Sequence, residues 1–103
     1  MNVKLPPIVL VAIAATSGAM AADGKAIATD HGCMACHSPG KPMIGPSFEK
    51  IAVHYKGKAD APTVLFQSIK AGSRGKWGVM VMKPDTQLSD EDTRVVVDWL
   101  LAN

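Results

Sequence analysis

The chain has 103 residues, and its 11 Lys and Arg against 9 Asp and Glu give a formal net charge of +2 at pH 7. This length suits one small domain. The nearly balanced charge, without a basic patch or a recognisable module, argues against nucleic acid binding. Two cysteines are too few for a disulfide-rich secreted scaffold, which depends on several bridges.

The N-terminus has the three parts of a secretory signal peptide. Residues 1–4 carry a lysine, residues 5–16 are apolar, and residues 17–21 end in small residues at the spacing that signal peptidase reads. The apolar run contains Pro6 and Pro7 and is 12 residues long, whereas a membrane-spanning helix needs about 20. We therefore predict cleavage rather than a membrane anchor.

Cleavage after Ala21, or one residue later after Ala22, would leave one domain over residues 22–103. We expect residues 1–21 to be the signal peptide, and the mature protein to lie in the periplasm of a Gram-negative bacterium without stable membrane insertion. A chain of this size buries only about 60 to 65 per cent of its unfolded surface. Its own apolar residues would give a marginal core, so we expect a buried cofactor to complete it.

The first predicted helix covers residues 23–30 and leads into the motif Cys-Met-Ala-Cys-His at residues 33–37. Two cysteines three residues apart, followed at once by a histidine, are the pattern of covalent haem attachment. In this chemistry the thiols of Cys33 and Cys36 add to the vinyl groups of one haem, and His37 becomes the proximal iron ligand. The motif therefore predicts one covalently bound haem c.

Other uses of a Cys-x-x-Cys pair fit this chain less well. A zinc site needs four ligands, and outside the motif only His31 and His54 offer nitrogen donors, without paired-histidine spacing. A thioredoxin-like loop should follow a β-strand, but residues 25–32 are rich in helix-compatible residues. A lone short disulfide loop closes little chain and so stabilises little.

Three further helices are predicted after the motif. Residues 38–46 contain three prolines and two glycines, which indicates a constrained loop. Ser47 is expected to cap a second helix that ends at residues 56–58, with an apolar stripe at Phe48, Ile51 and Ala52. A third helix is expected from Pro62 to residues 71–72, with an apolar face at Val64, Leu65, Ile69 and Phe66.

The last predicted helix follows Ser89, which is expected to cap it. Three acidic residues at 90–92 load its first turn with negative charge, which the helix dipole favours there. Its apolar stripe is predicted to be Val95, Val96, Trp99 and Leu100. We expect this stripe to pack on the first helix.

Residues 73–88 contain two glycines and one proline and form a long segment without a regular pattern. We expect this loop to supply the second axial iron ligand, because thioether sulfur favours ferrous iron and suits an electron carrier. In an extended segment Met80 and Met82 point the same way, so their chemistry alone leaves both open. The wider set of candidate ligands is His31, His54, Met34, Met43, Met80 and Met82.

Four ordered segments together resemble the short class I cytochromes c of bacteria, of the cytochrome c-551 type. They are the motif at 33–37, Met43-Ile44-Gly45-Pro46, residues 75–84 with Trp77, and the acid-capped terminal helix with Trp99. The resemblance covers essentially all of residues 22–103. It implies an all-α small cytochrome c fold, with about four to five short helices wrapped around one covalently bound haem.

The resemblance also implies roles for individual residues. In that family the axial methionine stands a few residues after the loop tryptophan and just before a proline-containing segment, which implies Met82 as the ligand and Met80 as packing near the haem. The carbonyl of Pro46 is implied to accept a hydrogen bond from His37, which fixes the ring. Trp77 is implied to donate to a haem propionate.

The sequence departs from the family pattern at two positions. The first helix of the family usually carries an aromatic residue that packs against the terminal helix, but residues 24–28 contain none, and we expect Trp99 to fill that space. Ser68 stands where some relatives have a basic side chain near a propionate. We therefore make no prediction for propionate ionisation.

The implied function is one-electron transfer without enzyme activity, because the protein would occupy both axial positions of the iron. The family's partners are a quinol-oxidising complex as donor and a terminal oxidase or nitrite reductase as acceptor. Lys41, Lys76 and Lys83 could serve such brief, salt-sensitive encounters of a monomer. Two alternatives stay open: a haem-based ligand sensor in which Met82 dissociates, and a cytochrome subunit of a larger reductase or oxidase complex.

Overall fold

The computed structural model describes residues 2–12 and 20–103. Residue 1 and residues 13–19, which hold part of the predicted signal peptide and of its cleavage motif, lie outside the described residues. Residues 2–12 are exposed and have no regular secondary structure. Within the described ranges, no helix is both long enough and apolar enough to cross a membrane.

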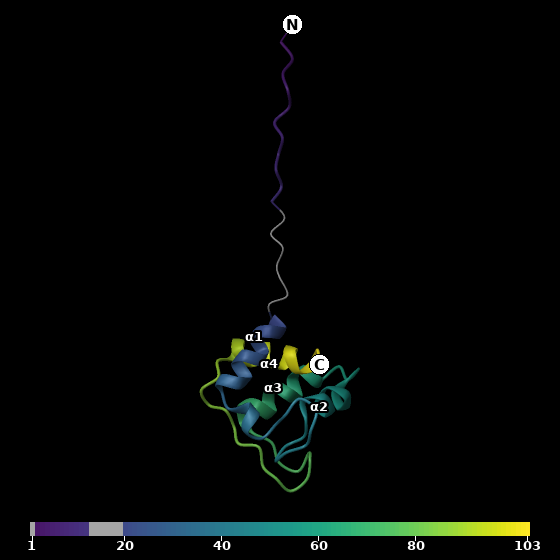
Figure 1. Ribbon diagram of the computed structural model, residues 1–103, viewed down its shortest axis with the longest axis vertical. Helices are drawn as coiled ribbons and strands as arrows, with labels where there is room; N and C mark the ends of the chain where they lie inside the picture. Colours follow the sequence, from purple (N-terminus) through teal and green to yellow (C-terminus); the bar gives the residue numbers. More distant parts are fainter. Residues whose placement is uncertain (1, 13–19) are drawn as a thin grey trace.

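The described chain is built from helices and loops (Figure 1). In residues 2–12 and 20–103, the only β pairing is an isolated antiparallel bridge between Ser73 and Met82. The all-α prediction is therefore confirmed. The elements in chain order are α1 (Met20–Asp30), the short 3-10 helix η1 (Cys33–Ala35), α2 (Phe48–Tyr55), α3 (Ala61–Ala71) and α4 (Asp90–Leu101).

Helix α1 begins at Met20, earlier than the predicted start at residue 23. Residues 21 and 22 are both alanine, the residue with the highest helix propensity, so the backbone continues the helix toward the N-terminus. The predicted cleavage sites therefore fall in the first turn of α1.

Serine caps begin α2 and α4, as predicted. The Ser47 hydroxyl accepts a hydrogen bond of 3.1 Å from the backbone N–H of Lys50, and the Ser89 hydroxyl accepts one of 3.1 Å from that of Asp92. Each cap satisfies one of the N–H groups that a helix start leaves without a partner. These two local signals set where both helices begin.

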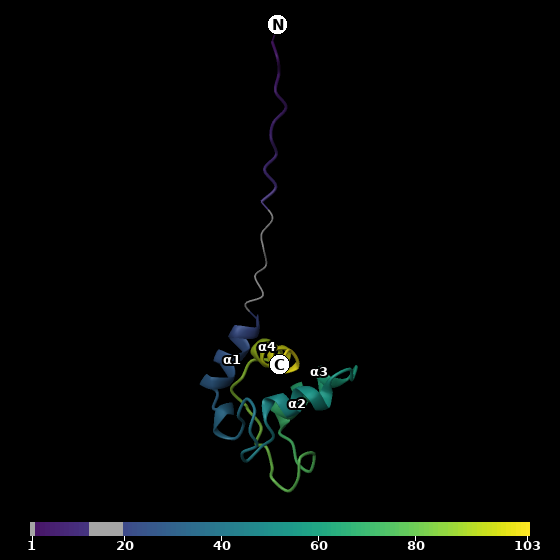
Figure 2. The same cartoon turned by 45° about the vertical axis from the view of Figure 1, so that its right-hand side comes forward.

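Helix α4 lies between the other helices, with α1 on one side and α3 on the other (Figure 2). Its most extensive packing is with α1, as predicted, but it also packs on α3 and α2. Because three helices cover it, its buried face is wider than the predicted stripe. Its buried residues are Thr93, Val96, Val97 and Leu100, whereas Val95 and Trp99 are half-buried.

The hydrophobic core joins all four helices to the end of the 73–88 loop. Its buried members are Ala28, Phe48, Ile51, Tyr55, Ala61, Leu65, Ile69, Leu88, Val96, Val97 and Leu100. Three predicted site residues, Cys33, Trp77 and Met82, are half-buried and pack against it. The candidate site is therefore built on the edge of the core.

Candidate functional site

The attachment motif forms a compact turn around η1. The backbone N–H groups of Cys36 and His37 both donate to the carbonyl of Cys33, at 3.3 and 3.1 Å. The thiols of Cys33 and Cys36 are free and their residues are half-buried. This turn keeps two thiols and one imidazole within a few residues of backbone, as covalent attachment of one haem requires.

The electrostatics of Cys33 differ from those of a redox-active cysteine. Burial raises the pKa of the Cys33 thiol above its usual value, and the negative charge of Asp85 adds to this effect. A thioredoxin-like loop instead lowers the pKa of its attacking cysteine. Cys33 therefore does not show the lowered pKa of such an attacking cysteine.

The ring of His37 is oriented by Pro46. Nδ1 of His37 lies 2.7 Å from the carbonyl oxygen of Pro46. Because a carbonyl only accepts, Nδ1 must carry the proton and donate, which leaves the lone pair on Nε2 free to bind a metal. The structure thus brings together His37 and Pro46, between which the family resemblance implied a hydrogen bond.

Two residues that the sequence reasoning did not assign to the site also confine His37. A β-carbon on Gly45 would lie 2.5 Å from Cε1 of the His37 ring, so no larger residue fits there. The ring of Phe48 stacks on that of His37, with ring centres 5.4 Å apart. The position of Gly45 beside Pro46, close after the motif, is the sequence signal that could have revealed it.

Met82 is anchored through its backbone to Ser73. Its N–H donates to the Ser73 carbonyl at 2.8 Å, and its own carbonyl accepts from the Ser73 N–H at 3.0 Å. Gly72 permits this close approach, because its φ is +83° and a β-carbon there would lie 2.7 Å from the Met82 carbonyl oxygen. Met82 is half-buried, whereas Met80 is 59% exposed.

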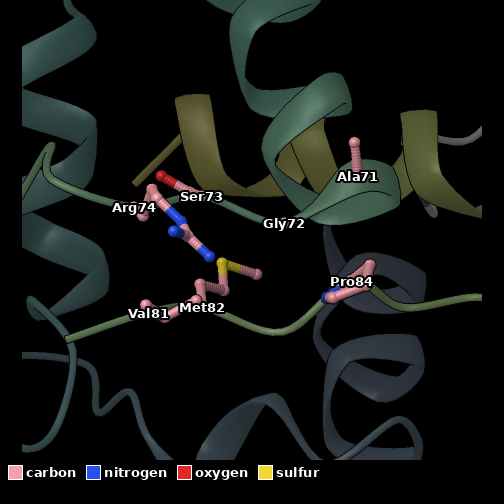
Figure 3. Close-up of a pocket in the computed structure, with 7 residues that line it drawn as sticks. All are labelled: Ala71, Gly72, Ser73, Arg74, Val81, Met82 and Pro84. Carbon is pink, nitrogen blue, oxygen red and sulfur yellow. The ribbon is translucent and has the colours of Figure 1, made fainter.

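The Met82 side chain lines a cavity of about 240 Å³ at the C-terminal end of α3 (Figure 3). The thioether lies between the two facing segments at 72–74 and 81–84, together with the guanidinium of Arg74. The full lining is Ala71, Gly72, Ser73, Arg74, Val81, Met82 and Pro84. A thioether held in such a hollow is available to a bound group.

Trp77 is half-buried beside two residues of α2. Its ring meets that of His54 edge-on, with centres 4.8 Å apart, and Nζ of Lys50 lies 5.8 Å from the centre of the indole ring. Nζ of Lys76 donates to the hydroxyl of Ser68 at 3.2 Å. A cation therefore stands beside Ser68.

The donor set fits a covalently bound haem. The donors are two free thiols, an imidazole with a free Nε2 and a backbone-anchored thioether. Cys33 and Met82 pack against the apolar core, and His37 stacks on its member Phe48. Cysteine thioethers with histidine and methionine axial ligands are the donor set of c-type haem. An all-α fold with these donors defines a small haem protein of the electron-transfer class.

Comparison with known proteins agrees with this class. Residues 21–103 match the family described as cytochrome c. The chain is 40% identical over 77 residues to cytochrome c2 of Rubrivivax gelatinosus. This match covers 73% of this chain and 91% of that protein. It is 34% identical over 103 residues to cytochrome c-551 of Pseudomonas aeruginosa, and this match covers 95% of this chain and 98% of that protein.

A solved structure shows the same fold. The crystal structure of wild-type Nitrosomonas europaea cytochrome c552 matches with a TM-score of 0.73 and 38% sequence identity, over 76% of this chain and 96% of that one. The chain therefore belongs to the cytochrome c family, as a class I monohaem cytochrome c of the c-551 type. Its cofactor is one covalently attached haem c, and its relatives are electron carriers.

Proposed function

We propose that the protein is a periplasmic one-electron carrier between a quinol-oxidising complex and a terminal oxidase or nitrite reductase. In this proposal Cys33 and Cys36 hold the haem covalently, and His37 and Met82 bind its iron from opposite faces. The haem supplies an iron that is reversibly oxidised and reduced by one electron. The protein supplies the two ligands, their orientation and the surface that partners meet.

The contact between His37 and Pro46 is the observation that carries the proposal. Its length of 2.7 Å is that of a good hydrogen bond, and it fixes both the tautomer and the direction of the ring. Donation from Nδ1 also increases the electron-donating strength of Nε2. A histidine ring oriented in this way can remain bound to the iron in both oxidation states.

Met82 is favoured over Met80 as the other ligand. The two hydrogen bonds with Ser73 restrain the backbone of Met82 directly, whereas Met80 and its neighbour Val79 are largely exposed. A ligand with a restrained backbone loses less conformational freedom when it binds. We assign Met82 to the iron and Met80 to packing near the haem.

Trp77 is proposed to donate its indole N–H to a haem propionate. Its neighbours support an anionic group there, because Lys50 lies near its ring and Lys76 lies next to it in the chain. The bond from Lys76 to Ser68 brings a positive charge to the position where, by the family resemblance, some relatives have a basic residue. Lys76 would then replace that residue from the neighbouring loop.

Residues 1–21 are proposed to be a cleaved signal peptide and residues 22–103 the mature domain. The family match begins at residue 21, which supports a boundary at this point. Haem is attached to bacterial c-type proteins outside the cytoplasmic membrane, so export suits the motif. We place the mature monomer in the periplasm on these grounds.

Brief contacts with partners are proposed to use the loops around the attachment motif and the methionine segment. Lys41, Lys76 and Lys83 are exposed on these loops. Exposed apolar side chains accompany them, such as Ile44, at 57% exposure, and Val79, at 95%. Mixed apolar and cationic surfaces suit fast encounters that weaken as salt rises.

Two measurements on the purified holoprotein test the carrier. Membranes with a quinol-oxidising complex should reduce it, and a terminal oxidase should reoxidise it at a rate that falls with ionic strength. Lys76→Gln should lower this rate more than Lys25→Gln, because Lys25 lies on α1, away from both loops. Carbon monoxide should not bind the reduced protein at neutral pH. Rapid binding would favour the ligand sensor, and a stable complex in gel filtration would favour the subunit.

A further inference from the structure

Asp85 uses its backbone N–H and both carboxylate oxygens to fasten the end of the loop at residues 73–88. Its backbone N–H donates to the carbonyl of Ile69 at the end of α3, at 2.8 Å. Its Oδ1 accepts from the backbone N–H groups of Gln87 and Leu88, at 2.9 and 3.0 Å. Its Oδ2 lies 3.3 Å from Nδ1 of His31. The residue therefore contacts three backbone groups and the imidazole of His31.

The pair formed by His31 and Asp85 connects the two segments that carry the iron site. His31 lies in the turn between α1 and η1, two residues before Cys33, and Asp85 lies three residues after Met82. Asp85 is also close enough to Cys33 for its charge to act on that thiol. A direct side-chain link thus runs from the cysteine side of the site to the methionine side.

Few other contacts restrain this part of the loop. Met82 itself is held by its backbone bonds to Ser73. The next residue along the chain that is held by such contacts is Asp85. Among the described residues there is one other ion pair, between Lys70 and Asp90 at 3.0 Å, and it joins α3 to α4 instead. The side chains of His31 and Asp85 are only 28% and 21% exposed, so their contact is partly shielded from water.

We propose that Asp85, through its contact with His31, is a positioning residue that holds Met82 within reach of the iron. This inference rests on the proposed assignment of Met82 as an axial ligand. A segment held by more contacts at its downstream end spends more time in the ligand-bound arrangement than one held by fewer. Loss of the link should therefore raise the population in which Met82 is dissociated. An external ligand binds only that population, so its apparent affinity reports the link directly.

The test is a titration of the ferric holoprotein with imidazole, followed by its absorption spectrum. Asp85→Asn keeps an oxygen for the N–H groups of Gln87 and Leu88 but removes the charge that faces His31. We expect it to raise the imidazole affinity about threefold, the range of a partly exposed ion pair. His31→Gln should raise the imidazole affinity by the same amount. Because both substitutions break the same contact, the double variant should bind imidazole little more tightly than either single variant. Unchanged affinity in both single variants would overturn the proposal.

A matched control separates positioning from general loosening. Asp90→Asn removes the other ion pair, whose Lys70 also donates to the Leu88 carbonyl, but it leaves the contact of His31 with Asp85 and the backbone bonds of Met82 in place. It should therefore leave the imidazole affinity unchanged. An equal rise in Asp90→Asn would overturn the positioning role. The proposed function fails separately: a wild-type protein without the far-red sulfur-to-iron band would reject Met82 and Met80 as ligands before any variant is compared.

Discussion

Gly24 of α1 and Trp99 of α4 are in direct contact. A β-carbon on Gly24 would overlap Cβ of Trp99 and would lie 2.9 Å from its Cγ. This contact explains why α1 has no aromatic residue: α4 approaches so closely that Trp99 occupies the space itself. Trp99 then meets Phe48 edge-on, with ring centres 5.0 Å apart, and Phe48 stacks on His37. The helix pair and His37, the proposed iron ligand, therefore belong to one packed unit.

Gly24→Ala should destabilise the protein by about 2 kcal/mol, because overpacking at a rigid contact exceeds the gain in helix propensity of about 1 kcal/mol. Chemical denaturation of the holoprotein measures this change. Lys25→Ala, at the exposed neighbouring position of the same helix, should change the free energy of unfolding by no more than about 0.5 kcal/mol. Equal effects of the two substitutions would contradict the close contact.

Gly45→Ala should displace the His37 ring, because the new methyl group would lie 2.5 Å from Cε1. We expect part of the ferric protein to become high-spin, and a loss of stability of about 1 to 3 kcal/mol. Absorption spectroscopy and denaturation check the two effects. Gly40→Ala in the same loop is the control, since a β-carbon there meets Glu49 only at an ordinary 3.6 Å. A normal low-spin spectrum in Gly45→Ala would show that the ring does not need this space.

Asp85 should make the stability depend on pH in the acid range. Partial burial alone would raise the pKa of its carboxyl, but hydrogen bonds from Gln87 and Leu88 and the charge of His31 outweigh it and hold the pKa below the ordinary 3.8. The folded state thus favours the carboxylate. Its stabilisation is complete above the unfolded-state pKa and is lost as the pH falls through the lower folded-state pKa.

Asp85→Asn should therefore cost about 1 to 2 kcal/mol near pH 6, the worth of hydrogen bonds to a charged group. The difference from the wild type should disappear once the pH falls below the folded-state pKa of Asp85, because both side chains are then neutral. Denaturation curves at several pH values give the comparison. A difference that stays constant with pH would mean that the carboxylate charge contributes nothing.

The local parts of the fold could be predicted from the sequence. The serine caps of α2 and α4, the attachment motif and the apolar stripe of α2 depend on residues a few positions apart, so their patterns are readable without the tertiary structure. The wider buried face of α4 was not readable, because it depends on how many helices surround it. Val97 and Thr93 are buried for that reason.

The candidate site likewise has residues that the local sequence predicts and residues that it does not. The motif predicted both cysteines and His37 directly, whereas Pro46, Trp77 and the choice of Met82 over Met80 needed the family resemblance. The contacts of Asp85 with His31, of Phe48 with His37 and of Gly72 with Met82 join residues distant in sequence or in different elements. Side-chain chemistry alone does not indicate which distant pairs the fold brings together.

The absorption spectrum of the exported holoprotein tests the central claim most directly. The oxidised protein should show a low-spin c-type spectrum with the far-red sulfur-to-iron band. Met82→Ala should lose that band, and Met80→Ala should keep it. Loss of the band in Met80→Ala alone would contradict the assignment of Met82, and a protein without covalent haem would contradict the whole account.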